Sequence, residues 1–100
     1  MNMVISVKVR LIGVFRVLSG KSRLPVEVEE EPAIVGKVIQ KLVEAFSPGF
    51  REALIDPELK DPRPNALILV NGKEISVLQG LETEVNKGDE IVLVPVSHGG

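Results

Sequence analysis

Apolar and polar residues alternate along the first part of the chain. Every odd position from Met3 to Leu11 is apolar, and the intervening positions include Ser6, Lys8 and Arg10. Because successive side chains of a strand point to opposite faces of a sheet, this period of two predicts a half-buried strand. The alternation returns over Leu24–Val28, after the turn signal Gly20-Lys21-Ser22. We expect the two strands to form an antiparallel hairpin, with Pro25 on its outer, edge strand.

A helical period follows in the middle of the chain. The apolar residues recur at spacings of one, three and four, which predicts one continuous apolar helix face. They are Ile34, Val35, Val38, Ile39, Leu42, Val43 and Phe46. We expect Glu29–Glu31 and Pro32 at the start of this helix, because negative charge and a fixed φ favour a helix N-terminus. Ser47-Pro48-Gly49 should end it.

The remaining chain predicts a connection and three short strands. Residues 47–65 contain four of the seven prolines, which indicates an irregular surface segment, with room for a short helix at Phe50–Ile55. Leu67–Val70 reads as a strand, and Asn71-Gly72 favours a type I′ turn into a partner strand at Lys73–Val77. Gly88-Asp89 marks a further turn, before a last strand at Glu90–Val94.

Two strands, one helix and three strands define an α+β fold. One main helix crossing a mixed sheet of about five strands is the β-grasp arrangement, with the first and last strands parallel at the centre. The spacing leaves no linker between domains. We therefore expect a single domain over residues 1–95 and a flexible tail over residues 96–100.

The composition excludes several kinds of site and partner. With 44% apolar and 26% charged residues the chain can close one core, and the lack of cysteine excludes disulfides, thiolate metal sites and a cysteine nucleophile. Residues 1–26 hold five bases and no acid, yet aromatic residues for stacking on bases are few, so we expect no direct nucleic-acid contact. No apolar run approaches the ~20 residues of a membrane span, so we expect no membrane contact and a cytoplasmic location.

Conventional catalytic groups are scarce. The sole histidine is His98, which cannot form a triad or a metal pair with another histidine, so we expect neither a metal site nor catalysis by this chain alone. The unusual feature is the ending Ser97-His98-Gly99-Gly100. Glycine has no Cβ, so such a tail can enter a channel closed to branched residues. Five extended residues after Pro95 reach roughly 17 Å, far enough to carry a terminal carboxylate into another protein.

These features together resemble the MoaD/ThiS family of ubiquitin-like sulfur carriers. The resemblance spans nearly the whole chain and rests on Phe15-Arg16, Leu69-Val70-Asn71-Gly72-Lys73, Lys87-Gly88-Asp89-Glu90 and the final Gly99-Gly100. The molybdopterin branch usually carries a Pro-Pro pair before the tail, whereas this chain has only Pro95. Its His98-Gly99-Gly100 ending is closer to the ubiquitin-related modifier that supplies sulfur for tRNA thiolation.

The resemblance implies a carrier cycle at Gly100. A ubiquitin-activating-type enzyme would use ATP to adenylate the Gly100 carboxylate, and a sulfur donor would convert it to a thiocarboxylate. No cofactor would be bound, and Ser97, His98 and Gly99 would be recognised by partners. These partners would include the large subunit of a molybdopterin synthase if the protein serves that pathway. Two alternatives stay open: a modifier joined through Gly100 to lysines, and a binding module in which the glycines have no role.

Two of the predicted strands are apolar on both faces, although one helix can cover only one face. We expect whichever residues point outward to form a docking patch for the activating enzyme. The candidates are Leu67, Ile68, Leu69, Val70, Ile91, Val92, Leu93 and Val94. The alternative is that residues 47–65 fold back and cover this face.

Overall fold

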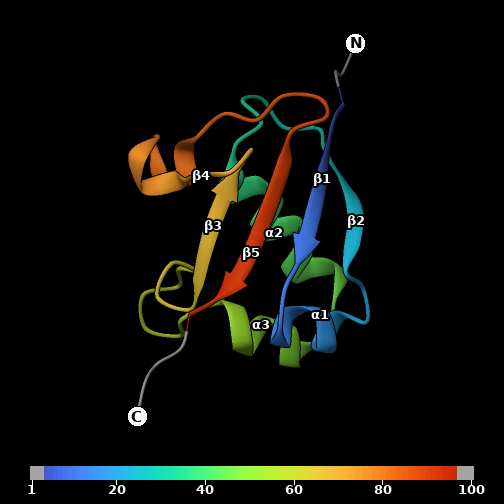
Figure 1. The fold of residues 1–100 in the computed structure, drawn as a ribbon, viewed down its shortest axis with the longest axis vertical. Helices are drawn as coiled ribbons and strands as arrows, with labels where there is room; N and C mark the ends of the chain where they lie inside the picture. Colours follow the sequence, from blue (N-terminus) through green and yellow to red (C-terminus); the bar gives the residue numbers. More distant parts are fainter. Residues whose placement is uncertain (1–3, 97–100) are drawn as a thin grey trace.

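A five-stranded mixed sheet forms the centre of the protein (Figure 1). The computed structural model describes residues 4–96. The strands lie in the order β2-β1-β5-β3-β4, with β1 and β5 parallel and the other neighbours antiparallel. Their bounds are β1 Ile5–Leu11, β2 Arg23–Val28, β3 Ala66–Val70, β4 Lys73–Glu74 and β5 Glu90–Pro95. The β-grasp arrangement predicted from the sequence is confirmed, including β2 as an edge strand.

The helices cover one face of this sheet. Helix α2 (Val35–Ala45) crosses behind the strands in Figure 1, and α1 (Val14–Ser19) and α3 (Pro48–Leu54) lie at its lower end. Two short 3-10 helices, η1 (Ile75–Val77) and η2 (Gly80–Glu82), follow β4. No helix in residues 4–96 has the length and apolar character needed to cross a membrane.

The core lies between α2 and the covered face of the sheet. The buried side of α2 consists of Val35, Val38, Ile39 and Leu42, as its period predicted. Phe15 of α1 and Phe50 of α3 are fully buried, and their rings meet edge to face with centroids 6.0 Å apart. In the described part of the chain every buried side-chain nitrogen or oxygen has a hydrogen-bond partner.

Helix α1 was not predicted. The sequence indicated only a turn between the first two strands, whereas residues 14–19 form a helix that ends at Gly20, in the left-handed region with φ 73°. Of the four apolar residues of α1, only Phe15 is buried, whereas Val14, Val17 and Leu18 are exposed. The segment therefore lacks the continuous apolar face by which a core helix is recognised.

Helix α2 begins later than predicted. It starts at Val35, and its first turn holds no acidic residue, so the expected role of Glu29–Glu31 and Pro32 at the helix start is wrong. Glu30 instead forms an ion pair with Lys41, at 3.6 Å. The start is held from outside the helix, because the Val35 amide donates to the Thr83 carbonyl at 2.9 Å and Ile34 bridges to Glu84.

The strand predicted at Lys73–Val77 is also shorter in the structure. Asn71 and Gly72 have φ of 49° and 84°, as the predicted type I′ turn requires, but β4 ends at Glu74. The Glu74 carboxylate accepts hydrogen bonds from the amide of Ser76, at 2.6 Å, and from its hydroxyl, at 2.8 Å. This cap starts η1, and Ile75 is buried in the core.

Candidate functional site

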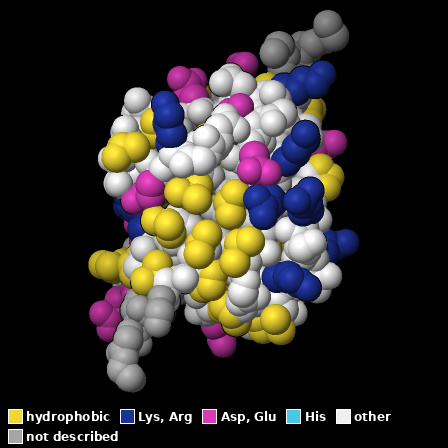
Figure 2. Space-filling view, viewed as in Figure 1, with side chains coloured by type: hydrophobic (Ala, Val, Ile, Leu, Met, Phe, Trp, Pro, Cys, Tyr) yellow, Lys and Arg dark blue, Asp and Glu magenta, His cyan; other side chains and the backbone are white. Residues whose placement is uncertain are grey.

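The face of the sheet away from the helices carries an apolar patch. Leu67 lies opposite Val94, and Leu69 lies opposite Val92, across the β3–β5 pairing. Leu67 is 40% exposed and the other three are half-buried. We call these four residues the open-face patch, and Figure 2 shows hydrophobic side chains gathered over β3 and β5. The other four candidates, Ile68, Val70, Ile91 and Leu93, are buried in the core.

Residues 47–65 do not cover this patch. Helix α3 packs against α1 and α2, on the helix side of the sheet. The rest of the segment folds on itself, with a bridge between Asp56 and Asp61 and a hydrogen bond from Asn65 Nδ2 to the Leu54 carbonyl. The alternative in which this segment shields the outward face is therefore wrong.

Basic residues flank the open-face patch. Lys8 and Arg10 alternate with buried residues of β1, so they share the outward face with the patch, and Arg10 lies beside Val92 in the register. Arg23 lies opposite Arg10 on β2. Figure 2 shows Lys and Arg side chains gathered on the β1–β2 side. Glu90 is within 4.0 Å of Arg10 and offsets this charge only in part. The arrangement suits a partner with an apolar centre and an acidic border.

The end of β5 is anchored beside the patch. The Val96 amide donates to the Asn65 carbonyl at 3.0 Å, and Val96 is itself 41% exposed. On the other side, a Cβ on Gly13 would lie 2.9 Å from Pro95 Cγ, so the backbone of Gly13 and the proline ring are in close contact. The predicted tail residues Ser97, His98, Gly99 and Gly100 lie outside the described residues.

The perturbed carboxylates have structural causes. The hydrogen bonds from the backbone and hydroxyl of Ser76 hold the pKa of Glu74 below its usual value. A side-chain hydrogen bond from Arg63 does the same for the pKa of Asp61. Both groups hold local turns together, and neither lies in a cluster of titratable side chains: residues 4–96 contain no group of three or more Asp, Glu or His that would hold a metal ion.

Sequence reasoning missed the basic residues that flank the open-face patch. It noted the bases of residues 1–26 only to exclude nucleic-acid contact, and it did not place Lys8, Arg10 and Arg23 beside the apolar strands. The signal was present, since Lys8 and Arg10 occupy the even positions of an alternating strand. The parallel pairing of β1 with β5 was predicted, but its register, which places Lys8 beside Glu90 and Arg10 beside Val92, was not.

A mixed five-stranded sheet with a central parallel pair, a single crossing helix and an open outer face defines the ubiquitin-like β-grasp class. Comparison with known families then identifies the group. The model of the ThiS family matches residues 9–100, and the chain belongs to this family.

Relatives and solved structures agree with this assignment. A protein of Archaeoglobus fulgidus, provisionally named a sulfur carrier protein, is 35% identical over 88 residues, which cover 80% of this chain and 97% of that protein. Small archaeal modifier protein 3 of Haloferax volcanii is 33% identical over 94 residues, covering 93% and 97% of the two chains. The solution structure of small archaeal modifier protein 1 from Methanosarcina acetivorans matches with a TM-score of 0.83 and 28% identity, over 99% of this chain and all of that one. The group thus includes both sulfur carriers and ubiquitin-like modifiers.

Proposed function

We propose that this protein is a sulfur carrier whose reactive group is the carboxylate of Gly100. The observation that carries the proposal is the family match, which runs from the β-grasp body through to Gly99-Gly100. This proposal is supported by the open-face patch, which lies on β3 and on β5, the strand that leads to these residues. The tail would supply the chemistry, and the folded body would supply recognition.

The chemistry follows from the state of a terminal carboxylate. Its pKa of ~3.3–3.7 leaves it ionised and a poor electrophile at neutral pH. In the proposed cycle the Gly100 carboxylate attacks the α-phosphorus of ATP, which releases pyrophosphate and forms an acyl-adenylate. A sulfide-level donor then attacks the acyl carbon and displaces AMP, which leaves a thiocarboxylate with no net oxidation. Its sulfur is a nucleophile that a partner can use, so the protein acts as a group carrier. The need for ATP favours a cytoplasmic location.

The open-face patch would dock the activating enzyme. Leu67 and Val94 offer apolar area, and Lys8, Arg10 and Arg23 offer a positive border. Burying the patch against a ubiquitin-activating-type enzyme would hold the base of the tail, at Pro95 and Val96, beside that enzyme. Residues 97–100 would then extend into its active site, where glycines at 99 and 100 fit a narrow channel and Ser97 and His98 contact its walls.

The sulfur of the thiocarboxylate is proposed to be used in molybdopterin synthesis or in tRNA thiolation. In the first case the protein would pair with the large subunit of a molybdopterin synthase. In the second, the thiocarboxylate would serve the enzyme that thiolates tRNA. The protein itself would act as a carrier in both cases, with no bound cofactor.

A second candidate function has its own support. The Haloferax volcanii relative, with 33% identity, is named a modifier protein. The same acyl-adenylate could be attacked by a lysine amine of another protein, which would form an isopeptide bond and release AMP. The two functions share the activation step and differ in the nucleophile that follows.

Intact-mass measurement tests both. The full chain is incubated with ATP, sulfide and a ubiquitin-activating-type enzyme from the same organism. We expect a mass increase equal to one oxygen replaced by one sulfur, absent when ATP is omitted and absent in a variant that lacks Gly99-Gly100. A flexible tail, as the sequence predicts, would add little to the stability of the body, so the truncated variant should unfold at the same denaturant concentration.

Other outcomes separate the alternatives. Heavier covalent adducts in a cell extract, lost in the truncated variant, would favour the modifier. An unchanged mass of the full chain, or the same change in the truncated variant, would contradict activation at Gly100. Gly100→Ala serves as a finer control, because it keeps the carboxylate and adds only a Cβ.

A further inference from the structure

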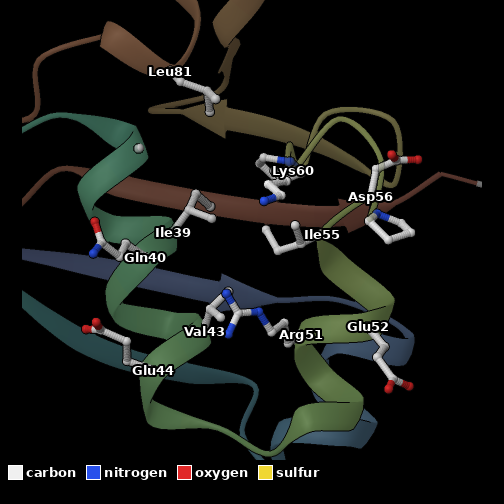
Figure 3. A pocket seen from close by; sticks show the side chains of 13 residues that line it. Ile39, Gln40, Val43, Glu44, Arg51, Glu52, Ile55, Asp56, Lys60 and Leu81 are labelled. Atoms are coloured by element: carbon white, nitrogen blue, oxygen red, sulfur yellow. The ribbon is translucent and has the colours of Figure 1, made fainter.

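A groove of about 640 Å³ lies on the helix side of the molecule, away from the open-face patch (Figure 3). One wall is α2, and the other is formed by α3 and the segment that follows it to Pro62. Ile39 and Val43 of α2 and Ile55 line its apolar interior, and Leu81 of η2 lies at one end. None of the four residues of the open-face patch lines this groove.

Two cations project into the groove. Figure 3 shows the side chains of Arg51 and Lys60 pointing toward the space between Val43, Ile39 and Ile55. Neither forms an ion pair within residues 4–96, where the salt bridges join Arg10 to Glu90, Lys41 to Glu30 and Arg63 to Asp61. Two unpaired positive charges beside an apolar surface are the complement of an amphipathic anion.

The acidic residues of the groove do not neutralise these cations. In Figure 3 the carboxylates of Glu44 and Glu52 point outward, away from the groove. Asp56 also points away, and its Oδ1 accepts hydrogen bonds from the amides of Glu58, at 3.0 Å, and Leu59, at 2.8 Å. The charge that faces the interior is therefore positive, although the lining as a whole contains three acids and two bases.

We propose that this groove binds a short acidic segment of another polypeptide. Its aliphatic side chains would lie on Ile39, Val43 and Ile55, and its carboxylates would pair with Arg51 and Lys60. A polypeptide fits better than a small molecule, because Gln40, Arg51 and Lys60 at the rim are all exposed and the groove is open. Small ligands depend on a site that encloses most of their surface, whereas amphipathic helices bind in open apolar grooves.

The groove and the open-face patch are separated by the body of the protein. The groove lies between α2 and α3 on the helix side, whereas the open-face patch lies on the opposite face of the sheet. A partner in the groove would therefore leave the sheet and the C-terminal segment accessible. The proposal does not depend on activation of Gly100, and the two can fail separately.

Binding of a defined probe tests this site. The probe is a capped synthetic peptide of leucine and glutamate, with the leucines at helical spacing, and its counterpart carries lysine in place of glutamate. Titrated into isotopically labelled protein, the acidic peptide should shift the backbone amides of Ile39, Val43, Ile55 and Lys60. The amides of Leu67 and Val94 should not move. Affinity should fall as salt is raised, since the charges are partly exposed.

A pair of matched variants isolates the two cations. The double change R51E and K60E should weaken binding of the acidic peptide by about tenfold or more, which corresponds to about 1.4 kcal/mol. The control K21E and K87E makes the same change in net charge at exposed sites outside the groove and should bind as the wild type does. The neutral pair R51Q and K60Q should give a smaller loss of peptide affinity. It tests the same two contacts if the charge-reversed protein misfolds.

Three results would overturn the proposal: no shift at the groove amides with millimolar peptide, equal binding of the lysine peptide, or an equal loss in the control variant. Deletion of Gly99-Gly100 should leave peptide affinity unchanged, whereas R51E and K60E should leave thiocarboxylate formation intact. These two measurements distinguish failure of the groove from failure of the carrier function.

Discussion

A single glycine controls the close approach between the start of α1 and the end of β5. Gly13 has φ 57° and ψ −129°, a region that residues with a Cβ rarely adopt, and an added Cβ would meet Pro95 Cγ at 2.9 Å. The backbone at this position therefore depends on glycine for two reasons, its conformation and its packing against the strand that leads to the tail.

Gly13→Ala should accordingly destabilise the fold by about 2 kcal/mol or more, because strain and a steric clash add. Gly20→Ala is the matched control, since Gly20 also has a positive φ, 73°, but no atom within 4 Å of an added Cβ. Its cost should be about 1 kcal/mol. Urea unfolding monitored by circular dichroism measures both, and equal losses would show that the contact with Pro95 has no energetic weight.

Residues also differ in how far the sequence predicts their roles. The turn at Asn71-Gly72 was predicted because its conformation depends on these two residues alone. Asn71 also has a second role, which was not predicted. Its side chain accepts a hydrogen bond from the Glu90 amide at 2.9 Å and donates to Asp89 Oδ1 at 3.1 Å, which ties the turn to the start of β5. Those partners are 18 and 19 residues away in the sequence.

At the scale of elements, the start of α2 depends on a loop far along the chain. Thr83 is buried, its carbonyl accepts from the Val35 amide, and its hydroxyl accepts from the Gln79 amide at 3.0 Å and donates to the Gly80 carbonyl at 2.7 Å. One residue thus holds η2 in shape and positions the first turn of α2, which has no side-chain cap of its own.

Thr83→Val keeps the shape of the side chain and removes both hydroxyl hydrogen bonds. We expect a loss of about 1 kcal/mol, because the Gln79 amide loses its acceptor and the Gly80 carbonyl keeps only the Thr83 amide as a donor. Thr83→Ser retains the hydroxyl and should lose less. Chemical unfolding compares the three proteins, and a Val variant as stable as the wild type would show that the two hydroxyl hydrogen bonds do not stabilise this loop.

Elements with a continuous buried face were predicted, and elements held by isolated contacts were not. The alternation over β1 and the apolar stripe of α2 each extend over several turns or pairs, so the period is evident in the sequence. Helix α1 buries Phe15 alone, and η1 depends on a cap between Glu74 and Ser76. Such short elements are stabilised by packing and local hydrogen bonds that leave no period to detect.

At the scale of the whole molecule, a charge placed in the open-face patch should weaken partner binding without unfolding the protein. Leu67→Asp places a charge on an outward side chain that is already 40% exposed, so stability should change little. Burial of a leucine is worth about 1.5–3 kcal/mol, so affinity for the activating enzyme should fall by about tenfold or more.

Val77→Asp is the control for this change. Val77 is an apolar residue of η1, 74% exposed and outside the patch. The Val77→Asp variant should bind the activating enzyme with the affinity of the wild type, as measured by calorimetric titration. Unaltered binding of Leu67→Asp, with both variants folded, would contradict docking through this face.

The sequence alone predicted the order of the main elements, the covered face of α2 and the apolar character of β3 and β5, because hydrophobic periods and two-residue turns are encoded by near neighbours. It also predicted the β-grasp arrangement, since few topologies join these elements by short, right-handed connections. Three features could be seen only in the folded molecule: which four of the eight apolar candidates face outward, where α2 begins, and that Arg51 and Lys60 both point into one groove. Those features arise from contacts between residues distant in the chain, whose register and packing are settled only when the sheet and helices come together.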